Sequence, residues 1–503
     1  MKNKWITKLL TVGMSFCLLT LNGCGKGEID DVKETLLEDA SGSGSANVSE
    51  QNTGNAQNGG KSTEMFTDRD MSGTYKEAEC VKLELKGDSV TCSSKAVQVE
   101  GSIVTITAEG TYLLSGILNN GMIVVNADDS AKVQLVLSGV EMNNDDGAVI
   151  YIKSGDKVFL TTAVGSINTL SNGGSYKILD ENNIDGVIFS KSDICFNGKG
   201  TLVVTATAGH GIVTKDDLKV TGGTIQVDAP RGHGLSGKDS VRIAAGEITV
   251  ASGKDGISAD NDEDTEKGYI YIAGGELDIA SGGDGVAASG MIRVDAVDLK
   301  INAGGGNANK TTAKNENGEV LSTKGIKAAG DLVLNDGTFV IDSQDDALHS
   351  NTNLTVNGGS YELATGDDGL HADETTTIAG GTINITTSYE GIEGNKVYVS
   401  GGYVKMFAND DGINAAGGND SGMGGMFGGD RFGASADSTV EISGGTIYMN
   451  AAGDGLDSNG SLIVTGGEVY LSGPTNGANG ALDYTTTGQV DGGTVVALGS
   501  AQM

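Results

Sequence analysis

The chain has 503 residues, a formal charge of −34, 81 glycines, 2 prolines and a single tryptophan. A surface this acidic repels nucleic acid and anionic lipid headgroups, so it excludes a nucleic-acid-binding protein and attracts divalent cations. The excess of glycine over an average protein indicates internal repetition or disorder rather than an ordinary globular enzyme.

The N-terminus resembles a bacterial lipoprotein signal. Lys2, Lys4 and Lys8 precede the apolar run LLTVGMSFCLLTL, and the phrase LNGC then ends at Cys24. The apolar run is too short to span a bilayer, which favours a cleaved signal peptide over residues 1–23. We therefore predict that Cys24 is lipidated. The lipid alone would then hold the protein on the extracellular face of the bacterial membrane.

Residues 24–75 are predicted to form a disordered polar tether. This region contains the low-complexity stretch SGSGSANVSEQNTGNAQNGGKS, which has too few apolar side chains to bury. Such a segment is typical of a flexible linker between an anchor and a folded domain.

Three cysteines follow the tether. Cys80 and Cys92 are close enough in the sequence for a disulfide in an exported protein, although the spacing alone does not decide it. Cys195 alternates with apolar residues in DICFNGKG and is predicted to be a buried thiol. No cysteine spacing indicates a zinc site.

A pattern of about 22 residues repeats from residue 185 onward. Each repeat has a small residue, an aliphatic residue, a strand, a turn with paired glycines, and a second strand. Insertions near 260–268, 303–323 and 417–438 widen three of the intervals. The small residues are Gly186, Gly211, Gly234, Gly256, Gly285, Gly325, Ala347, Gly369, Gly391, Gly412, Gly455 and Ala481.

This repeat predicts a solenoid of β-coils. Segments such as GGTINITT and GGEVYLS alternate apolar and polar residues, so each strand has one buried face. One coil cannot bury that face alone, and neighbouring coils must stack in parallel. A sandwich lacks a fixed repeat, and a propeller blade is about twice as long. We predict one all-β domain, a right-handed parallel β-helix, over residues 76–503, with less regular coils before residue 185.

Acidic residues recur directly before the small residue of each coil. Residues at equal phase lie about 4.8 Å apart in a solenoid. Like charges at that distance repel by roughly 1 kcal/mol per pair even in bulk water. Calcium binds oxygen at about 2.3–2.6 Å, so one ion between two coils reaches a carboxylate on each. Asp-Gly is also an ordinary turn dipeptide. The predicted calcium ligands are Asp345, Asp346, Asp367, Asp368, Glu390, Asp410, Asp411, Asp373 and Glu393.

A second polar position lies two residues after the small residue. Calcium prefers oxygen to nitrogen, so we expect the histidines here to bond to neighbouring carboxylates or to sugar hydroxyls. The residues predicted to contact substrate are His349, His371, Asn414, Asp457 and Lys327.

The phrases GTYLLSGILNNGMIVVNAD and KVQLVLSGVEM, with the lipoprotein signal and the repeated DGL and DGI coils, resemble a family of bacterial carbohydrate-binding-domain lipoproteins. The resemblance extends from about Cys80 to the C-terminus. It implies a right-handed β-helix like that of pectate lyases, bound calcium, and affinity for polygalacturonate and cellulose. Calcium shared between carboxylates of both partners would reconcile an acidic protein with an acidic polymer. The only tryptophan, Trp5, lies in the predicted signal peptide, which argues against a flat aromatic platform for cellulose.

Three functions are compatible with these features. We favour a non-catalytic, surface-anchored protein that binds pectate, and cellulose as a further partner, with calcium and without nucleic acid. The first alternative is a calcium-dependent pectate lyase, for which Lys327 is the best candidate base, although no residue is assigned as catalytic. The second alternative is a structural or adhesive rod.

Overall fold

The computed structural model describes residues 65–314, 318–415, 437–475 and 479–500. These residues belong to one compact unit, Gly60–Met503. The predicted signal peptide, Cys24 and the predicted tether as far as residue 64 lie outside the described residues. Most of the insertion near 417–438 also lies outside them. No helix in the described part of the chain is long and apolar enough to cross a membrane.

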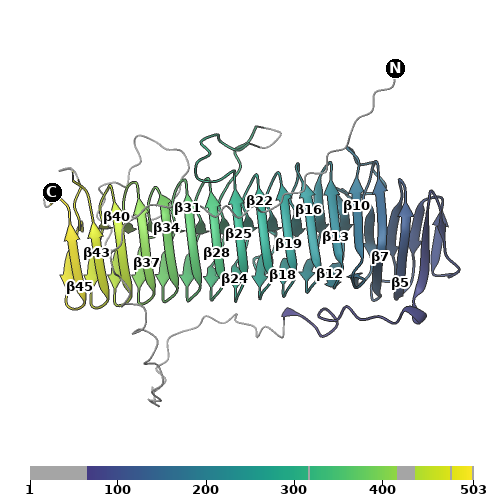
Figure 1. Cartoon of the computed structure of the whole chain (residues 1–503), viewed down its shortest axis with the longest axis horizontal. Helices are drawn as coiled ribbons and strands as arrows, with labels where there is room; N and C mark the ends of the chain where they lie inside the picture. Colours follow the sequence, from purple (N-terminus) through teal and green to yellow (C-terminus); the bar gives the residue numbers. More distant parts are fainter. Residues whose placement is uncertain (1–64, 315–317, 416–436, 476–478, 501–503) are drawn as a thin grey trace, which may run out of the picture. The chain divides into compact units, whose positions relative to one another are not determined.

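The unit is a parallel β-helix whose strands follow one another in chain order (Figure 1). Its strands form a larger sheet of 30 strands and a smaller sheet of 15, counted over the described residues. A regular coil gives one strand to the smaller sheet and two to the larger, as in β32 (Leu370–Ala372), β33 (Thr375–Ile378) and β34 (Thr382–Ser388). The predicted all-β parallel β-helix is confirmed.

The smaller sheet positions the predicted site, and consecutive strands in it pair in parallel from β6 onward. Its strands are β3 (Val97–Glu100), β4 (Ile103–Ile106), β6 (Met122–Asn126), β8 (Ile150–Ser154), β11 (Gly186–Ser190), β14 (His210–Thr214), β17 (Leu235–Gly237), β20 (Ile257–Ala259), β23 (Val286–Ala288), β26 (Ile326–Ala328), β29 (Leu348–Ser350), β32, β35 (Ile392–Glu393), β38 (Ile413–Ala415) and β41 (Leu456–Ser458).

Columns of aliphatic side chains fill the interior. Leu348, Leu370 and Ile392 are register partners in successive coils, and all three are fully buried. Phe339 and Tyr361 stack inside the coils with ring centroids 4.5 Å apart. Burial of such a side chain contributes roughly 1.5–3 kcal/mol, so the repeated column stabilises coils that would not fold alone.

Two different constraints explain the glycine content. At the small position, the Cβ of an alanine replacing Gly391 would lie 2.3 Å from the carbonyl oxygen of Gly412 in the next coil. The second glycine of the paired turns instead has a positive φ, 91° at Gly381 and 85° at Gly402. That region of backbone space is strained for residues with a Cβ. Glycine is therefore required at one corner of the coil by the close approach of the next coil, and at another corner by a positive φ.

The folded unit begins before residue 76. Phe66 packs against Tyr271, with ring centroids 6.1 Å apart, and Asp70 is fully buried. The Asp70 carboxylate lies 3.2 Å from the Nζ of Lys157 and 3.6 Å from the Nζ of Lys219, two lysines on the larger sheet. Residues 65–75, which we expected to belong to the tether, therefore contact the β-helix instead.

The three described cysteines are free thiols. Cys80 and Cys92 are partly exposed and do not form the disulfide that the spacing left open. Cys195 is fully buried, and burial raises the pKa of its thiol to about 12. The prediction of a buried thiol is confirmed.

We expect Gly391→Ala to lower the melting temperature, because its Cβ would overlap a backbone carbonyl that belongs to the next coil. Overpacking of this kind costs about 1–3 kcal/mol. Gly174→Ala is the matched control, since a Cβ there meets nothing within 4 Å. Thermal unfolding followed by circular dichroism checks both variants. Equal melting temperatures would contradict the close-approach explanation of the small position.

Candidate functional site

One column of side chains closes a corner of each coil by hydrogen bonds to the next. Asp346 Oδ1 accepts the backbone N–H of Asp368 at 3.0 Å, and Asp368 Oδ1 accepts that of Glu390 at 3.3 Å. Asp411 Oδ1 accepts the N–H of Asp454 at 2.6 Å. We call this set the corner column. It comprises His210, His233, Asp255, Asp284, Lys324, Asp346, Asp368, Glu390, Asp411 and Asp454.

In the earlier coils, histidine side chains accept these hydrogen bonds in place of aspartate. His210 Nδ1 accepts the N–H of His233 at 3.0 Å, and His233 Nδ1 accepts that of Asp255 at 3.2 Å. Histidine Nδ1 and aspartate Oδ1 are equally far from the backbone in bonds, so either atom reaches the next coil. Buried backbone N–H groups need an acceptor. The recurring aspartates therefore have a structural cause that does not depend on a metal.

A second column lies on the outer face of the smaller sheet. His349 pairs with His371, Glu393 pairs with Asn414, and Asn414 pairs with Asp457 in the strand register. The structure thus brings the polar positions that follow each small residue side by side. We call this set the face column. Its members are Val213, Ser236, Ser258, Ala287, Lys327, His349, His371, Glu393, Asn414 and Asp457.

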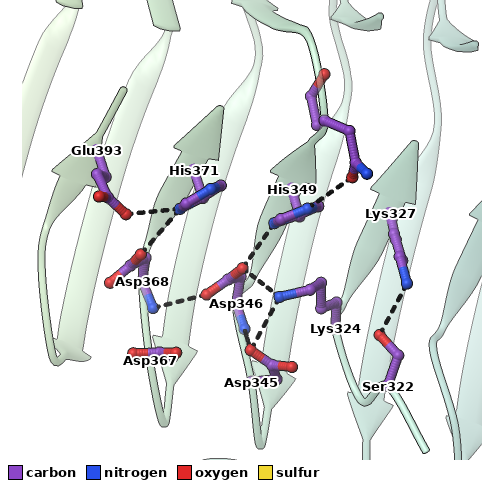
Figure 2. A network of polar contacts seen from close by, with 12 residues as sticks. Ser322, Lys324, Lys327, Asp345, Asp346, His349, Asp367, Asp368, His371 and Glu393 are labelled. Carbon is purple, nitrogen blue, oxygen red and sulfur yellow. Dashed lines mark hydrogen bonds and ion pairs between the residues drawn. The ribbon is translucent and has the colours of Figure 1, made fainter. Parts of the chain in front are cut away.

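A lysine of the chain neutralises one coil of the acidic network (Figure 2). Lys324 Nζ lies 2.5 Å from Asp346 Oδ2 and 3.0 Å from Asp345 Oδ1, and the lysine side chain is 9% exposed. Burial alone would raise the pKa of Asp346, but Lys324 and the hydrogen bond with His349 hold it well below its usual value. Sequence analysis missed Lys324 because an insertion precedes it. The signal is its place directly before Gly325, where other coils carry an acid.

The two face-column histidines lie beneath the surface. Their rings stack with centroids 4.7 Å apart, and the side chains of His349 and His371 are 5% and 0% exposed. His349 Nδ1 contacts Asp346 Oδ2 at 2.8 Å, and His371 Nδ1 contacts Glu393 Oε2 at 2.7 Å (Figure 2). His349 thus holds a carboxylate of its own coil in place, whereas His371 contacts a carboxylate of the next coil.

The carboxylates around His371 favour the cationic form of its ring. Burial would lower its pKa, but hydrogen bonds to Asp368, Asp373 and Glu393 outweigh burial and raise the pKa above its ordinary value. The contact with Asp368 Oδ2 is 3.1 Å, and Nε2 lies 3.2 Å from Asp373 Oδ1. Asp373 and Glu393, both predicted calcium ligands, are therefore placed around a histidine.

Other carboxylates remain poorly compensated. Burial, together with nearby carboxylates, raises the pKa of Asp368 and of Glu390 well above their usual values. Asn414 Nδ2 donates to Glu390 Oε2 at 2.9 Å. The folded chain disfavours charge on these two acids, and a bound cation would relieve that cost.

Two clusters in the described part of the chain contain only oxygen ligand atoms. The first is Asp345, Asp346 and Asp367, and the second is Asp411, Asp454 and Asp457. The donor atoms within each cluster lie within 4.8 Å of one another. Oxygen-only sets suit calcium, whereas the two clusters that include a histidine are already joined by internal hydrogen bonds.

An amide oxygen without a hydrogen-bond partner lies beside the second oxygen cluster. Asn414, the register partner of Asp457, is 7% exposed, and its Oδ1 has no hydrogen-bond partner among the described residues. Burial and neighbouring carboxylates raise the pKa of Asp411 and Asp457 to about 7. A divalent cation satisfies both the orphaned oxygen and the crowded carboxylates. Asp454, which the sequence analysis did not select, completes this cluster.

Two predicted residues are not members of these clusters. Lys327 is 32% exposed, with Nζ 3.3 Å from Ser322 Oγ and 4.0 Å from Asp284 Oδ2. Asp410 precedes Asp411 but belongs to none of the clusters found among the described residues. Among the described residues, Asp284 is the carboxylate that forms an ion pair with Lys327.

Comparison with known proteins identifies the family. Residues 100–369 match the model of the family described as carbohydrate-binding domain-containing protein, and this match covers more than half of the chain. The chain belongs to this family. The match includes Asp345 and Asp367 and ends at Gly369, before the cluster of Asp411, Asp454 and Asp457.

Two individual relatives were found. A carbohydrate-binding domain-containing protein of Acetivibrio thermocellus is 41% identical over 122 residues, which are 24% of this chain and 43% of that protein. The chain thus spans less than half the length of this curated relative. A solved structure described as a polysaccharide lyase-like protein from C. thermocellum, gadolinium derivative, is 33% identical and covers 51% of this chain and 96% of its own, with a TM-score of 0.46.

The raised pKa of Asp411 and Asp457 predicts how stability depends on pH in the metal-free protein. Both acids keep their protons to about pH 7 when folded but lose them near their ordinary pKa of 3.8 when unfolded. Their contribution is therefore complete below about pH 4 and is lost as the pH rises through 7. We expect Asp411→Asn with Asp457→Asn to melt about 2 °C or more above the unmodified chain at pH 8.

The same pair should melt alike at pH 4, where the unmodified acids carry protons. Asparagine keeps the oxygen that accepts the N–H of Asp454, so the corner hydrogen bond is retained. Differential scanning calorimetry in a chelating buffer measures the difference between the variant and the unmodified chain. A difference that does not change between pH 4 and pH 8 would show that these acids are not crowded.

Proposed function

We propose that this protein is a surface-anchored, non-catalytic carbohydrate-binding protein that holds polygalacturonate through calcium. The family supplies the carbohydrate-binding part of this proposal. The observation that carries the calcium part is the oxygen cluster of Asp411, Asp454 and Asp457 beside the unpaired Oδ1 of Asn414. Lipidation of Cys24 would keep the β-helix at the extracellular face of the membrane.

Charge explains why an acidic protein would use calcium to bind an acidic polymer. The chain carries a formal charge of −34, and polygalacturonate carries one carboxylate per sugar. A calcium ion accepts six to eight oxygen ligands, more than the three aspartates of either cluster provide. The remaining positions can take a carboxylate and hydroxyls of the polymer, so the ion changes repulsion into attraction.

The two oxygen clusters suit a polymer better than a single sugar. They occupy different coils of the same smaller-sheet edge, at Asp345–Asp367 and at Asp411–Asp457. Repeated carboxylates along a polygalacturonate chain would meet repeated cation sites along the coils. Binding at both sites raises the overall affinity through effective concentration without any new kind of contact.

Cellulose is a second proposed ligand, for a different face. Tyr448 and Tyr470 stack with ring centroids 4.8 Å apart, and Tyr448 is 39% exposed. They line a cavity of about 360 Å³ on the larger sheet together with Val496 and Leu498. Because the two rings cover each other's faces, the surface that they leave exposed consists of ring edges beside apolar side chains, and this apolar surface would suit the apolar faces of neutral pyranose rings. Outside the predicted signal peptide the sequence has no tryptophan for a cellulose platform, and in our proposal these tyrosines would provide the aromatic contact instead.

We expect polygalacturonate beads to retain more of the protein in excess calcium than in EDTA. Asp411→Asn with Asp457→Asn should bind calcium at least about tenfold more weakly, a loss of about 1.4 kcal/mol, because two ligand charges are removed. Isothermal titration calorimetry measures the affinity. Asp128→Asn with Asp129→Asn is the control, since these aspartates lie in a turn outside both clusters.

Equal calcium affinity in the two variants would contradict the assignment of the cluster. If EDTA reduces the retention on the beads of neither the double variant nor the unmodified chain, calcium does not connect the protein to the polymer. Ultraviolet absorbance of the reaction mixture should stay constant, because a binding protein makes no unsaturated uronate. A steady rise would favour the lyase.

A further inference from the structure

Four lysines occupy one position in successive coils at the N-terminal part of the smaller sheet. Ile152, Ser190, Thr214 and Gly237 are consecutive register partners. A lysine follows each of them in the sequence, whereas Asp260 follows the next partner, Ala259. We call the four residues the lysine column; they are Lys153, Lys191, Lys215 and Lys238.

The two lysines in the middle of the lysine column, Lys191 and Lys215, form no ion pair with a carboxylate of the described residues, although the charge of Lys215 acts on the nearby Asp185 carboxylate. Lys153 pairs with Asp180 at 3.0 Å, and Lys238 pairs with Glu263 at 2.7 Å. Positive charges one coil apart repel each other as the aspartates do. An anionic ligand would relieve this repulsion, in a chain that is otherwise strongly acidic.

A groove of about 180 Å³ separates the lysine column from the corner column. Lys215 and Lys238 line one side of it, and His210 and His233 line the other. The face column lies between them and forms the floor, where successive coils provide Val213, Ser236 and Ser258. The groove therefore combines cations, hydroxyl groups and imidazoles in a single cavity.

The histidines offer hydrogen-bond donors to this groove. Their rings stack with centroids 4.9 Å apart and an angle of 2° between planes. His210 Nδ1 accepts a backbone N–H, and burial with the nearby His233 and lysines lowers the pKa of His210 to about 3. The neutral ring therefore carries its proton on Nε2. Among the described residues, none accepts a hydrogen bond from Nε2 of either His210 or His233.

We propose that this groove binds one hexuronate ring of the polysaccharide, with its carboxylate on Lys215 and Lys238 and its hydroxyls on Ser236, Ser258 and the imidazoles. This assignment rests on the proposed function and adds a subsite that needs no calcium. Lysine ammonium groups make charge-assisted bonds to a carboxylate, and neutral imidazole and serine groups match sugar hydroxyls.

The size and the limits of the groove support a single acidic ring. Pockets for drug-sized ligands measure about 300–1,000 Å³, so a cavity of about 180 Å³ suits one ring rather than an oligosaccharide. Asp260 lines its far end, so the basic surface stops within one coil. The groove also lies within residues 100–369, the part of the chain that matches the carbohydrate-binding family.

The test measures how a short oligogalacturonate binds to the full chain by isothermal titration calorimetry, in EDTA and in calcium. The unmodified chain should bind in EDTA, and Lys215→Ala with Lys238→Ala should bind at least tenfold more weakly. Lys215→Arg with Lys238→Arg should retain most of the affinity. The matched control is Lys86→Ala with Lys300→Ala, which removes two exposed, ion-paired lysines from the larger sheet.

The outcomes separate this subsite from the calcium sites. Asp411→Asn with Asp457→Asn should leave the binding in EDTA unchanged. Affinity in EDTA that is equal for the unmodified chain and the Lys215 and Lys238 alanine variant would overturn the subsite, as would equal binding of a fully methyl-esterified oligomer. Binding in calcium but not in EDTA would overturn it while the proposed function stands. An absence of binding under both conditions would overturn both.

Discussion

Registered stacking of the coils is the constraint on which the rest of this structure depends. Each coil meets the next at the same phase, so a side chain has a counterpart of the same position about 4.8 Å away. Inside, this places Leu348, Leu370 and Ile392 in one continuous apolar column. Outside, it places like charges together, and the chain must find a way to stabilise them. The corner column, the histidine stacks and the lysine column all result from this stacking in register.

Three kinds of interaction can reduce the repulsion among the stacked carboxylates. Aspartate oxygens accept backbone N–H groups of the next coil, as between Asp346 and Asp368. Cations of the chain enter the acidic network, namely Lys324 and the protonated His371. Where neither is enough, as at Asp411 and Asp457, the pKa of the carboxyl groups stays raised, and in our proposal a metal ion would supply the remaining positive charge. Of the two proposed calcium sites, the cluster of Asp411, Asp454 and Asp457 is thus the one with the weaker internal compensation, since Lys324 already contacts Asp345 and Asp346.

Charge is also separated along the chain. The position directly after the smaller-sheet strand is lysine at Lys191, Lys215 and Lys238, and it is aspartate at Asp260 in the next coil. In the proposed account, early coils would meet a uronate directly and later coils would meet it through calcium. One acidic polymer could then contact both regions, although the whole chain carries a charge of −34.

The repeat period, the small residue and the strand alternation were enough to predict the fold, because every coil of a solenoid imposes the same requirements of size and burial on its residues. They also placed His349 beside His371 and Asn414 beside Asp457. They did not predict that His371 is fully buried, because neighbouring coils cover it and strand alternation says only which face a side chain takes. Hydrogen bonds between coils, such as that from Asp454 to Asp411, are equally invisible in a linear pattern.

Contacts between distant segments limited the prediction most. Phe66 and Asp70 stand in a polar stretch whose composition indicates disorder, yet Asp70 finds Lys157 and Lys219 far along the chain. Lys324 follows an insertion that obscures its place in the repeat. Asp454 precedes the small residue Gly455 but was not selected, and its place beside the carboxylates of Asp411 and Asp457 becomes visible only in the structure. In each case the sequence carried the residue but not the partner that gives it a role.

Crystals grown with saturating calcium, or with a lanthanide in its place, would test the central claim most directly through an anomalous difference map. The account predicts a peak about 2.3–2.6 Å from oxygens of Asp411, Asp454 and Asp457, with the Oδ1 of Asn414 turned toward it. A map without ion density at this cluster, with the three carboxylates turned apart on separate faces, would contradict it.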